Sequence, residues 1–291
     1  MFRRERYRLR LPSRTLQLGE RTLIMGILNV TPDSFYAGGR YADAQLAVSR
    51  AFEMEQAGAD ILDIGAESTR PGADPVSADE EIARVLPVLE GLQGKLRIPI
   101  SLDTRKAEVA EAGLRRGVEI INDVSGLRAD PELAGVVKSH RAALVLVHMR
   151  GSPRSMHKGP FARDVISDVA RGLRAATATA RTANISQSKI LVDPGIGFGK
   201  SYKQNFEILA RLSELARLGY PLVVGVSRKM FIGWALAGRR QPWPAERREW
   251  GTAAAVTAAI LNGAHIVRVH DVNEMSQVAR IADAALAPGR I

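Results

Sequence analysis

The sequence predicts an α/β fold, a closed (β/α)8 TIM-type barrel preceded by a short N-terminal β-hairpin. Eight short runs rich in Val, Ile and Leu alternate with eight helical patterns over residues 23–286, and this alternation is typical of a parallel sheet covered by helices. Strand-to-helix links are long and rich in Gly and Pro, whereas links such as Gly58–Asp60 from helix to strand are short. An open doubly wound sheet is the alternative.

The N-terminal segment, residues 1–22, is predicted to be a basic hairpin extension, and residues 23–291 a single barrel domain. Residues 7–11 and 16–23 alternate apolar and polar side chains around a Pro12–Ser13 turn, which favours a hairpin. Seven Arg and two Glu give this extension +5 of the net charge of +10. We interpret the arginines as a solvated surface and expect residues 2–6 to be dispensable for turnover. Few aromatic residues lie between these arginines, so we do not expect the segment to bind nucleic acid.

The predicted strands are near-continuously apolar, as strands covered on both faces are. They span residues 23–28, 61–64, 98–102, 119–122, 143–147, 190–192, 222–226 and 266–269. The predicted helices span residues 42–57, 77–92, 106–116, 163–183, 204–218, 246–261 and 273–286, with one more after Asp130–Pro131. Ser77 and Glu80 form a capping-box pattern, and Asp130 and Pro131 suit an N-cap and the first helical position.

Composition excludes several classes of chemistry. The chain has 291 residues and no Cys, which removes disulfides, thiol nucleophiles and Cys-ligated zinc. No apolar run approaches the roughly 18–20 residues of a membrane span, and the start lacks the apolar stretch of a signal peptide, so we expect a cytoplasmic protein. The stretch 194–201 fails as a phosphate-binding P-loop because Pro194 replaces the required Gly. We interpret the glycines of this stretch as residues that allow its backbone to approach a ligand closely.

Polar residues end most of the predicted strands, where barrel active sites lie. Asp103, Asn122 and Asp193 suit a flat heterocycle rich in N–H donors. Arg268 and His270, with Lys229 nearby, suit a phosphate-bearing group. Each also has an ordinary explanation, since Asp103 can cap a helix and Asp193 can start a turn. The carboxamide oxygen of Asn29 is a hard ligand that suits Mg²⁺ held mainly by phosphate oxygens.

Eight motifs together resemble the dihydropteroate synthase family of pterin-binding enzymes, in order over residues 24–286. They are GILNVTPDSF, DIGAESTRPGA, SLDT, INDVSG, DPGIGFGK, GVSRK, GTAAAV and GAHIVRVHDV. The resemblance implies a (β/α)8 barrel and the condensation of (7,8-dihydropterin-6-yl)methyl diphosphate with 4-aminobenzoate to 7,8-dihydropteroate and diphosphate. It also implies a Mg²⁺ cofactor, an enzyme of the kind that sulfonamide drugs target by mimicking 4-aminobenzoate, and a homodimer formed through the last helices.

The matched motifs imply a role for each site residue. Those implied for the pterin are Asp103, Asn122, Met149, Asp193, Lys229 and Arg268. Those implied for diphosphate are Asn29, Thr69, Arg268 and His270, with Asn29 also holding Mg²⁺. Those implied for 4-aminobenzoate are Arg70, Pro71, Phe198, Lys229 and Met230, and the catalytic set comprises Asp103, Lys229, Arg268 and His270.

Met230 departs from the family pattern, which often has Ser after the matching Lys. We predict that Lys229–Met230 opens a short helix before Gly233 and that main-chain N–H groups there hold the aminobenzoate carboxylate. A buried core position for Met230 is the alternative.

Two other functions remain open from the residues. A methyltransferase that moves a methyl group from methyltetrahydrofolate to a corrinoid would share the Asp and Asn constellation, but it would not need NVTPDSF, SRK and the Arg268–His270 strand end together. A non-catalytic barrel that binds nucleic acid through its basic start would instead show salt-dependent retention of DNA or RNA.

Overall fold

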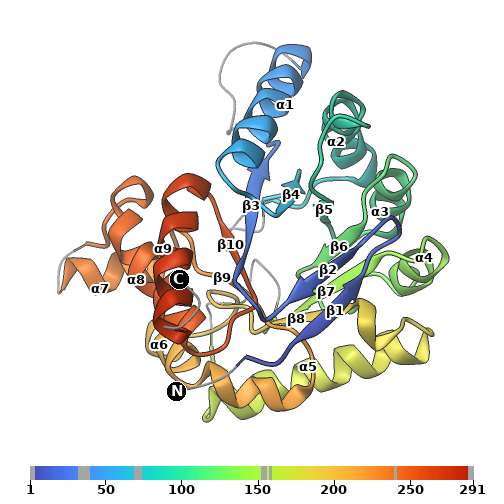
Figure 1. The fold of residues 1–291 in the computed structure, drawn as a ribbon. Coiled ribbons are helices and arrows are strands. Elements are labelled where there is room, and N and C mark those ends of the chain that lie inside the picture. The colour runs from blue at the N-terminus through green and yellow to red at the C-terminus, as the bar shows by residue number, and fades with distance from the viewer. Residues whose placement is uncertain are drawn as a thin grey trace.

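The computed structural model describes residues 4–31, 40–68, 74–151, 156, 159–238 and 241–287. Eight parallel strands form the barrel sheet, in the order β8-β7-β6-β5-β4-β3-β10-β9 (Figure 1). They are β3 (Leu23–Asn29), β4 (Ile61–Gly65), β5 (Ile100–Asp103), β6 (Ile120–Asp123), β7 (Ala143–Val147), β8 (Ile190–Asp193), β9 (Val223–Gly225) and β10 (Ile266–Val269). A parallel bridge between Val192 and Leu222 joins the two edges. The closed barrel is thus confirmed, and the open doubly wound sheet is wrong.

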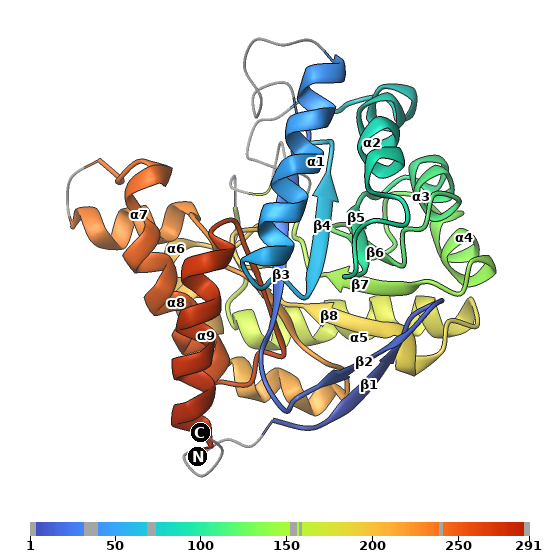
Figure 2. The same cartoon turned by 45° about the horizontal axis from the view of Figure 1, so that its top comes forward.

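The helices surround the strands (Figure 2). They are α1 (Arg40–Gln56), α2 (Ala78–Leu92), α3 (Ala107–Leu114), α4 (Leu133–Ser139), α5 (Val165–Thr182), α6 (Tyr202–Ala210), α7 (Met230–Ala237), α8 (Glu249–Leu261) and α9 (Val272–Leu286). Short 3-10 turns occupy Gln187–Lys189, Leu212–Leu218 and Ala245–Arg247. The helix expected over residues 204–218 is therefore two elements, and the one expected over 246–261 begins three residues late.

Side-chain caps support several helix starts. Ser77 accepts a hydrogen bond from the Glu80 N–H at 3.2 Å, as the capping pattern predicts. Asp130 serves two helices. Its Oδ1 atom accepts from the Glu132 N–H at 3.0 Å, as expected of a residue that precedes a helix, and its Oδ2 atom accepts from the N–H of Ala107, the first residue of α3, at 2.7 Å. The regular helix α4 begins at Leu133, two residues after the expected start at Pro131.

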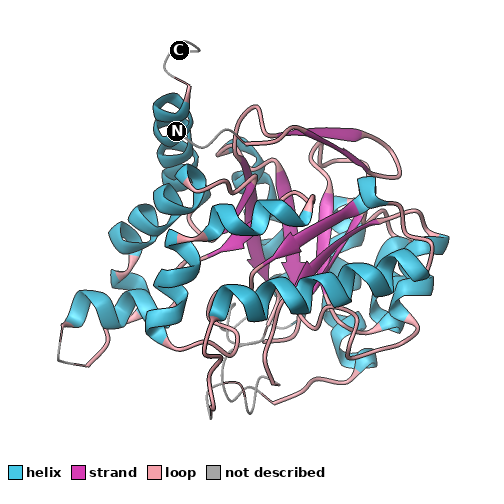
Figure 3. Ribbon diagram, turned by 90° about the horizontal axis from the view of Figure 1, so that it is seen from below, coloured by secondary structure: helices cyan, strands magenta, loops and turns pink. Residues whose placement is uncertain are grey.

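The hairpin closes one end of the barrel. Strands β1 (Tyr7–Arg10) and β2 (Thr15–Leu18) pair antiparallel, and Figure 3 shows them across the end opposite the long loops. Leu9, Leu11 and Leu18 are buried in one cluster with the first interior residues of the strands, such as Ile61 and Ile120. The hairpin is therefore the apolar floor of the barrel.

Arg4 of the basic start is used inside the molecule, so its interpretation as a solvated surface is wrong in part. Arg4 is 7% exposed and donates to Thr22 Oγ1 at 2.6 Å and to the Ala264 carbonyl at 3.0 Å. It also pairs with Asp283 on α9. Arg21, which is exposed, pairs with Asp60 at the start of the second β/α unit. These contacts tie the chain to the barrel on both sides of the hairpin.

Alternation along the strands sorts their side chains between two cores. Ile24, Leu62 and Leu102 pack outward against the helices. Met25 and Ile61 lie in the cluster that fills the barrel with the hairpin. Because side chains alternate between the two faces of a strand, the residue two positions after each interior apolar residue also points inward, one layer nearer the carboxyl ends.

Candidate active site

A polar layer lies inside the barrel above its apolar floor. Each member is two residues beyond an interior apolar or small residue of the same strand. The members are Asp63 on β4, Asp103 on β5, Asn122 on β6, Asp193 on β8 and Arg268 on β10. The structure therefore brings together, from separate strands, four residues that the sequence indicated and one, Asp63, that it did not.

Arg268 joins the two sides of this layer. Its Nε atom donates to Asp63 Oδ2 at 2.6 Å, and its Nη2 atom donates to Asp103 Oδ2 at 2.7 Å. Asp63 Oδ2 also accepts from Asn122 Nδ2 at 3.1 Å. The fully buried Asp63 carboxylate thus fixes both the Arg268 guanidinium and the Asn122 carboxamide. Because Arg268 uses its Nε and Nη2 atoms for the two carboxylates, its Nη1 atom can donate to a substrate.

Burial and the nearby Asp63 carboxylate make Asp103 easier to protonate. Burial raises the pKa of Asp103 to about 7, the negative charge of Asp63 adds to this rise, and the Arg268 charge opposes it. Two carboxylates that share one guanidinium retain a net negative charge in a site with little water. This charge faces the barrel opening, where it can stabilise a cation that develops on a bound ring.

A second group of site residues surrounds the loop after β8. Asp193 Oδ1 accepts from the Gly195 N–H at 2.6 Å, and burial raises the pKa of the Asp193 carboxyl. The Lys229 ammonium donates to the Ile196 carbonyl and lies 4.6 Å from the centre of the Phe198 ring. Burial lowers the pKa of Lys229 to about 8.

Two glycines of this loop allow close backbone contact within the protein, and the approach of the loop to a ligand stays a prediction. Gly195 has a φ of +66°, and a Cβ atom there would lie 1.9 Å from the His148 carbonyl oxygen. Gly199 has a φ of +70°, and a Cβ atom there would lie 2.5 Å from the Arg150 carbonyl oxygen. Both glycines allow the loop to rest directly on the chain that follows β7.

The residues expected at diphosphate lie on the same end of the barrel. His270 follows β10, and its Nδ1 atom is 2.9 Å from Ser227 Oγ after β9. Asn29 is the last residue of β3. A Cβ atom at Gly65 would lie 3.7 Å from Asn29 Oδ1 and 3.8 Å from Asp103 Oδ2, so these two oxygens border one space above a glycine. Thr69, Arg70 and Pro71 lie outside the described residues.

Met149 and Met230 occupy different environments. Met149 is buried after β7, and its carbonyl accepts from Arg128. Met230 is the first residue of α7 and its side chain is 47% exposed, so a core position for it is wrong. No side chain caps this helix start. The helix also continues through Gly233 to Ala237, further than expected.

Asp63 could have been found from the sequence by its alternation with Ile61. The strand 61–64 reads as continuously apolar around one acidic residue, and attention to residues at the strand ends passes over it. An acidic side chain in the middle of a barrel strand has no water to face, so it requires a cationic or amide partner. Arg268 and Asn122 are those partners.

Among the described ranges, no group of three or more His, Cys, Asp or Glu side chains is placed to hold a metal ion. Within the same ranges, no helix is both long enough and apolar enough to cross a membrane.

Residues 25–270 match the family described as pterin binding enzyme. The chain is 47% identical over 266 residues to the dihydropteroate synthase of Synechocystis, a match that covers 91% of each chain. The chain belongs to the dihydropteroate synthase family. This membership confirms the resemblance carried by the motifs and sets aside the corrinoid methyltransferases and the nucleic-acid barrel as alternatives.

Solved dihydropteroate synthases have the same fold. The enzyme of Xanthomonas albilineans with 4-aminobenzoic acid superposes with a TM-score of 0.88 at 40% identity, covering 97% of this chain and 99% of that one. The enzyme of Burkholderia cenocepacia complexed with 7,8-dihydropteroate gives a TM-score of 0.86 at 39% identity, covering 98% of both chains. The barrel of this chain is thus shared over nearly its whole length with solved dihydropteroate synthases.

Proposed function

We propose that the chain condenses (7,8-dihydropterin-6-yl)methyl diphosphate with 4-aminobenzoate, giving 7,8-dihydropteroate and diphosphate. The observation that supports this most is the Arg268 guanidinium held between Asp63 and Asp103 in one layer with Asn122 and Asp193. Such a layer offers carboxylate acceptors to the N–H groups of a pterin and keeps a cation beside them. Membership of the dihydropteroate synthase family supplies the reaction class.

The reaction needs stabilisation of charge more than it needs a base. The methylene C–O bond to diphosphate breaks as the amine nitrogen of 4-aminobenzoate forms the new C–N bond, and that nitrogen then releases a proton. Arg268 and His270 would stabilise the departing diphosphate, while the Asp103 carboxylate would stabilise positive charge on the pterin. Phe198 and Lys229, which contact each other, would form the wall against 4-aminobenzoate.

Mg²⁺ is the cofactor of this proposal. The carboxamide oxygen of Asn29 borders the same space as Asp103 Oδ2, and a neutral oxygen beside a carboxylate fits a hard cation. Asn29 would hold the ion, with the remaining ligands drawn from diphosphate and water. Bound there, it would supply positive charge to the leaving group.

The test is an incubation with the pterin diphosphate and 4-aminobenzoate, with release of diphosphate as the readout. We expect one diphosphate for each 7,8-dihydropteroate formed, and loss of both when Mg²⁺ is removed with a chelator. Addition of Mg²⁺ should restore turnover. Turnover that survives complete removal of divalent ions would contradict the magnesium assignment, and no turnover with any divalent ion would contradict the reaction.

A homodimer through the last helices remains a proposal. Trp250 on α8 is 83% exposed and Ile281 on the adjacent α9 is 74% exposed, and large exposed apolar side chains can mark an interface. Light scattering should give twice the mass of one chain for the unaltered protein. Trp250→Glu should give the mass of one chain, and an unchanged mass in this variant would place the interface elsewhere.

The expected location in the cytoplasm also remains a proposal. It is supported by the absence of Cys from the sequence, since the fold requires no oxidising compartment. Fractionation of the source cells, followed by assay of diphosphate release in each fraction, tests it directly. Activity confined to a membrane or secreted fraction would contradict it.

A further inference from the structure

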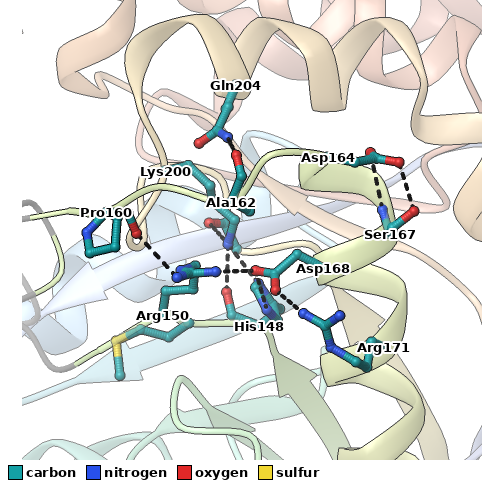
Figure 4. A network of polar contacts seen from close by, with 12 residues as sticks. His148, Arg150, Pro160, Ala162, Asp164, Ser167, Asp168, Arg171, Lys200 and Gln204 are labelled. Atoms are coloured by element: carbon teal, nitrogen blue, oxygen red, sulfur yellow. Dashed lines mark hydrogen bonds and ion pairs between the residues drawn. The ribbon is translucent and has the colours of Figure 1, made fainter.

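Lys200 is a buried cation that the proposed reaction does not use. Its side chain is 2% exposed, and its Nζ atom contacts four acceptors rather than a carboxylate. These are the carbonyls of His148 at 2.8 Å, Gly195 at 2.8 Å and Phe198 at 3.1 Å, together with His148 Nδ1 at 2.9 Å. Figure 4 shows this ammonium beside His148 in the surrounding polar network.

Three carbonyl oxygens converge on Lys200 Nζ, and a lysine ammonium has three N–H groups to donate to them. Burial lowers the pKa of Lys200 well below its ordinary value, and the nearby Asp193 charge opposes this shift. Burial also lowers the pKa of His148 to about 2, so its ring is neutral. The Nδ1 atom of this ring lies 2.9 Å from Lys200 Nζ, and its Nε2 atom lies 3.8 Å from Asp168 Oδ2. Arg150 and Arg171 hold that carboxylate in place (Figure 4).

The four acceptors belong to two different segments. His148 follows β7, whereas Gly195 and Phe198 belong to the loop after β8. Three carbonyl oxygens that converge without a cation would repel one another and remain buried without donors, which is costly. The Lys200 ammonium therefore joins the loop to the neighbouring strand end and selects the loop shape in which these oxygens meet.

The joined loop makes three contacts with two site residues, Asp193 and Lys229. The Gly195 N–H donates to Asp193, the Ile196 carbonyl accepts from the Lys229 ammonium, and the Phe198 ring lies 4.6 Å from the same ammonium. All three contacts involve loop residues from Gly195 to Phe198, and the carbonyls of these two end residues are the loop carbonyls that Lys200 binds. A shift of this loop therefore moves the groups that surround Lys229.

We propose that Lys200 is a positioning residue for 4-aminobenzoate, which acts by holding the Gly195–Phe198 loop in the shape that places Phe198 and Lys229. The inference rests on the proposed assignment of Phe198 and Lys229 to 4-aminobenzoate. It predicts a specific kinetic effect, because β8 itself holds Asp193 and leaves the pterin side of the site less dependent on the loop.

The first test compares Lys200→Met with Lys203→Met, an exposed lysine on α6. Lys200→Met should raise the KM for 4-aminobenzoate at least tenfold, with less than a threefold change in the KM for the pterin diphosphate. Lys203→Met should change neither. An unchanged KM for 4-aminobenzoate in folded Lys200→Met would overturn the proposal, as would an equal rise for both substrates.

The second test restores the charge chemically. Because the chain has no Cys, Lys200→Cys provides a single thiol that can be alkylated in the unfolded protein before refolding. Aminoethylation creates a side chain with an ammonium at nearly the length of lysine, and a propyl adduct matches it without the charge. The aminoethyl adduct should recover the original KM for 4-aminobenzoate within threefold, whereas the propyl adduct should not. Equal KM values, or a propyl adduct that fails to refold, would assign Lys200 to stability alone.

A third variant separates this proposal from the assignment on which it rests. Phe198→Ala should raise the KM for 4-aminobenzoate because it removes a wall of the proposed pocket. If Phe198→Ala raises that KM and Lys200→Met does not, the positioning role is wrong while the pocket stands. If neither variant raises it, the pocket assignment itself is wrong.

Discussion

Arg268 donates to Asp103 across the interior of the barrel, with 2.7 Å between Nη2 and Oδ2. The same guanidinium is held by Asp63, which is fully buried. Asp103 therefore has a fixed orientation before any ligand arrives, and only part of its charge is neutralised. Such preorganisation is what a site needs in order to stabilise charge that appears during a reaction.

Asp103→Asn should abolish turnover without unfolding the protein. The amide keeps the shape of the side chain but removes the negative charge beside the developing pterin cation. We expect kcat to fall by at least a hundredfold in the diphosphate-release assay.

The melting temperature of Asp103→Asn supplies the control. The pKa of Asp103 is raised in the folded protein to about 7. As the pH rises from the pKa of this carboxyl in the unfolded chain towards 7, its ionisation therefore makes the folded state less stable. At pH 8 the variant should therefore melt no lower than the unaltered protein. Full turnover in the folded variant would remove Asp103 from the catalytic set.

Asp63→Asn should alter the reaction indirectly, through Arg268 and Asp103. The guanidinium loses one of two anionic partners, and its looser placement should lower kcat/KM for the pterin diphosphate by about 10- to 100-fold. The pKa of Asp103 should also fall, because the charge of Asp63 helps to raise it.

Ser101→Ala is the matched control for Asp63→Asn. Ser101 is the partner of Asp63 in the register of β4 and β5, and its buried hydroxyl has no hydrogen bond among the described residues. It should leave kcat/KM within threefold. An Asp63→Asn variant that behaves like Ser101→Ala would show that the Arg268–Asp63 pair is structural only.

The pH profile of kcat/KM for the pterin diphosphate should have an acidic limb that rises with pH through about 7. Burial raises the pKa of Asp103 to about 7, and the protonated acid can neither accept an N–H at the same oxygen nor stabilise a cation. Activity is therefore present above this pKa and lost as the pH falls through it.

His270→Asn distinguishes Asp103 from an imidazole, whose ordinary pKa is about 6.5. The acidic limb should persist in this variant at lower overall activity. If the limb disappears, His270 is the titrating group. His148 and His265 cannot produce the limb, because burial lowers their pKa values to about 2 and about 4.

Local pattern predicted the barrel well because each unit contains its own signal. The strands at Ala143–Val147 and Ile266–Val269 match the expected ranges residue for residue, since an apolar run between turn signals identifies a strand covered on both faces. Asp130 bonds the Glu132 N–H near the start of α4, as expected, but its second contact, with the first N–H of α3, was missed. That contact joins residues 23 positions apart in the chain, and no local pattern contains it.

The site was predictable where residues end strands and not where they lie within them. Asn122 and Asp193 could be found because a polar residue follows an apolar run. Asp63 and Lys200 were missed because their importance depends on partners from other strands, namely Arg268 for one and His148 for the other. Buried charges reveal their roles only when the folded chain supplies those partners.

Arg4→Ala should destabilise the protein by about 3 kcal/mol, because it leaves the Thr22 and Ala264 acceptors and the Asp283 carboxylate without their buried cation. Residues 2–6 are therefore expected to be dispensable for turnover only at temperatures at which the protein stays folded without them. Denaturant unfolding measures the effect. Arg8→Ala changes an exposed arginine of β1 and should cost less than about 0.5 kcal/mol. Equal stabilities for the two variants would show that Arg4 does not anchor the segment.

Met230→Ser should leave the KM for 4-aminobenzoate unchanged or lower it. Met230 begins α7, and no side chain caps that helix, so N–H groups of its first turn can hold a carboxylate without help from the side chain. The half-exposed thioether lies 3.5 Å from Arg248 Nη2, and the Nη1 atom of the same guanidinium donates to the Arg228 carbonyl at 2.7 Å.

A serine at position 230 would add at most one hydrogen bond to the carboxylate, worth about 0.5–1.5 kcal/mol, or about a 2- to 12-fold lower KM. Turnover at saturating substrate should barely change, because the carboxylate is at the opposite end of 4-aminobenzoate from the reacting nitrogen. Met230→Leu keeps the apolar bulk and serves as the control for packing, with no change in KM. A KM that rises more than tenfold in folded Met230→Ser but not in Met230→Leu would make the side chain a principal apolar contact, and the main-chain account of carboxylate binding would then be wrong.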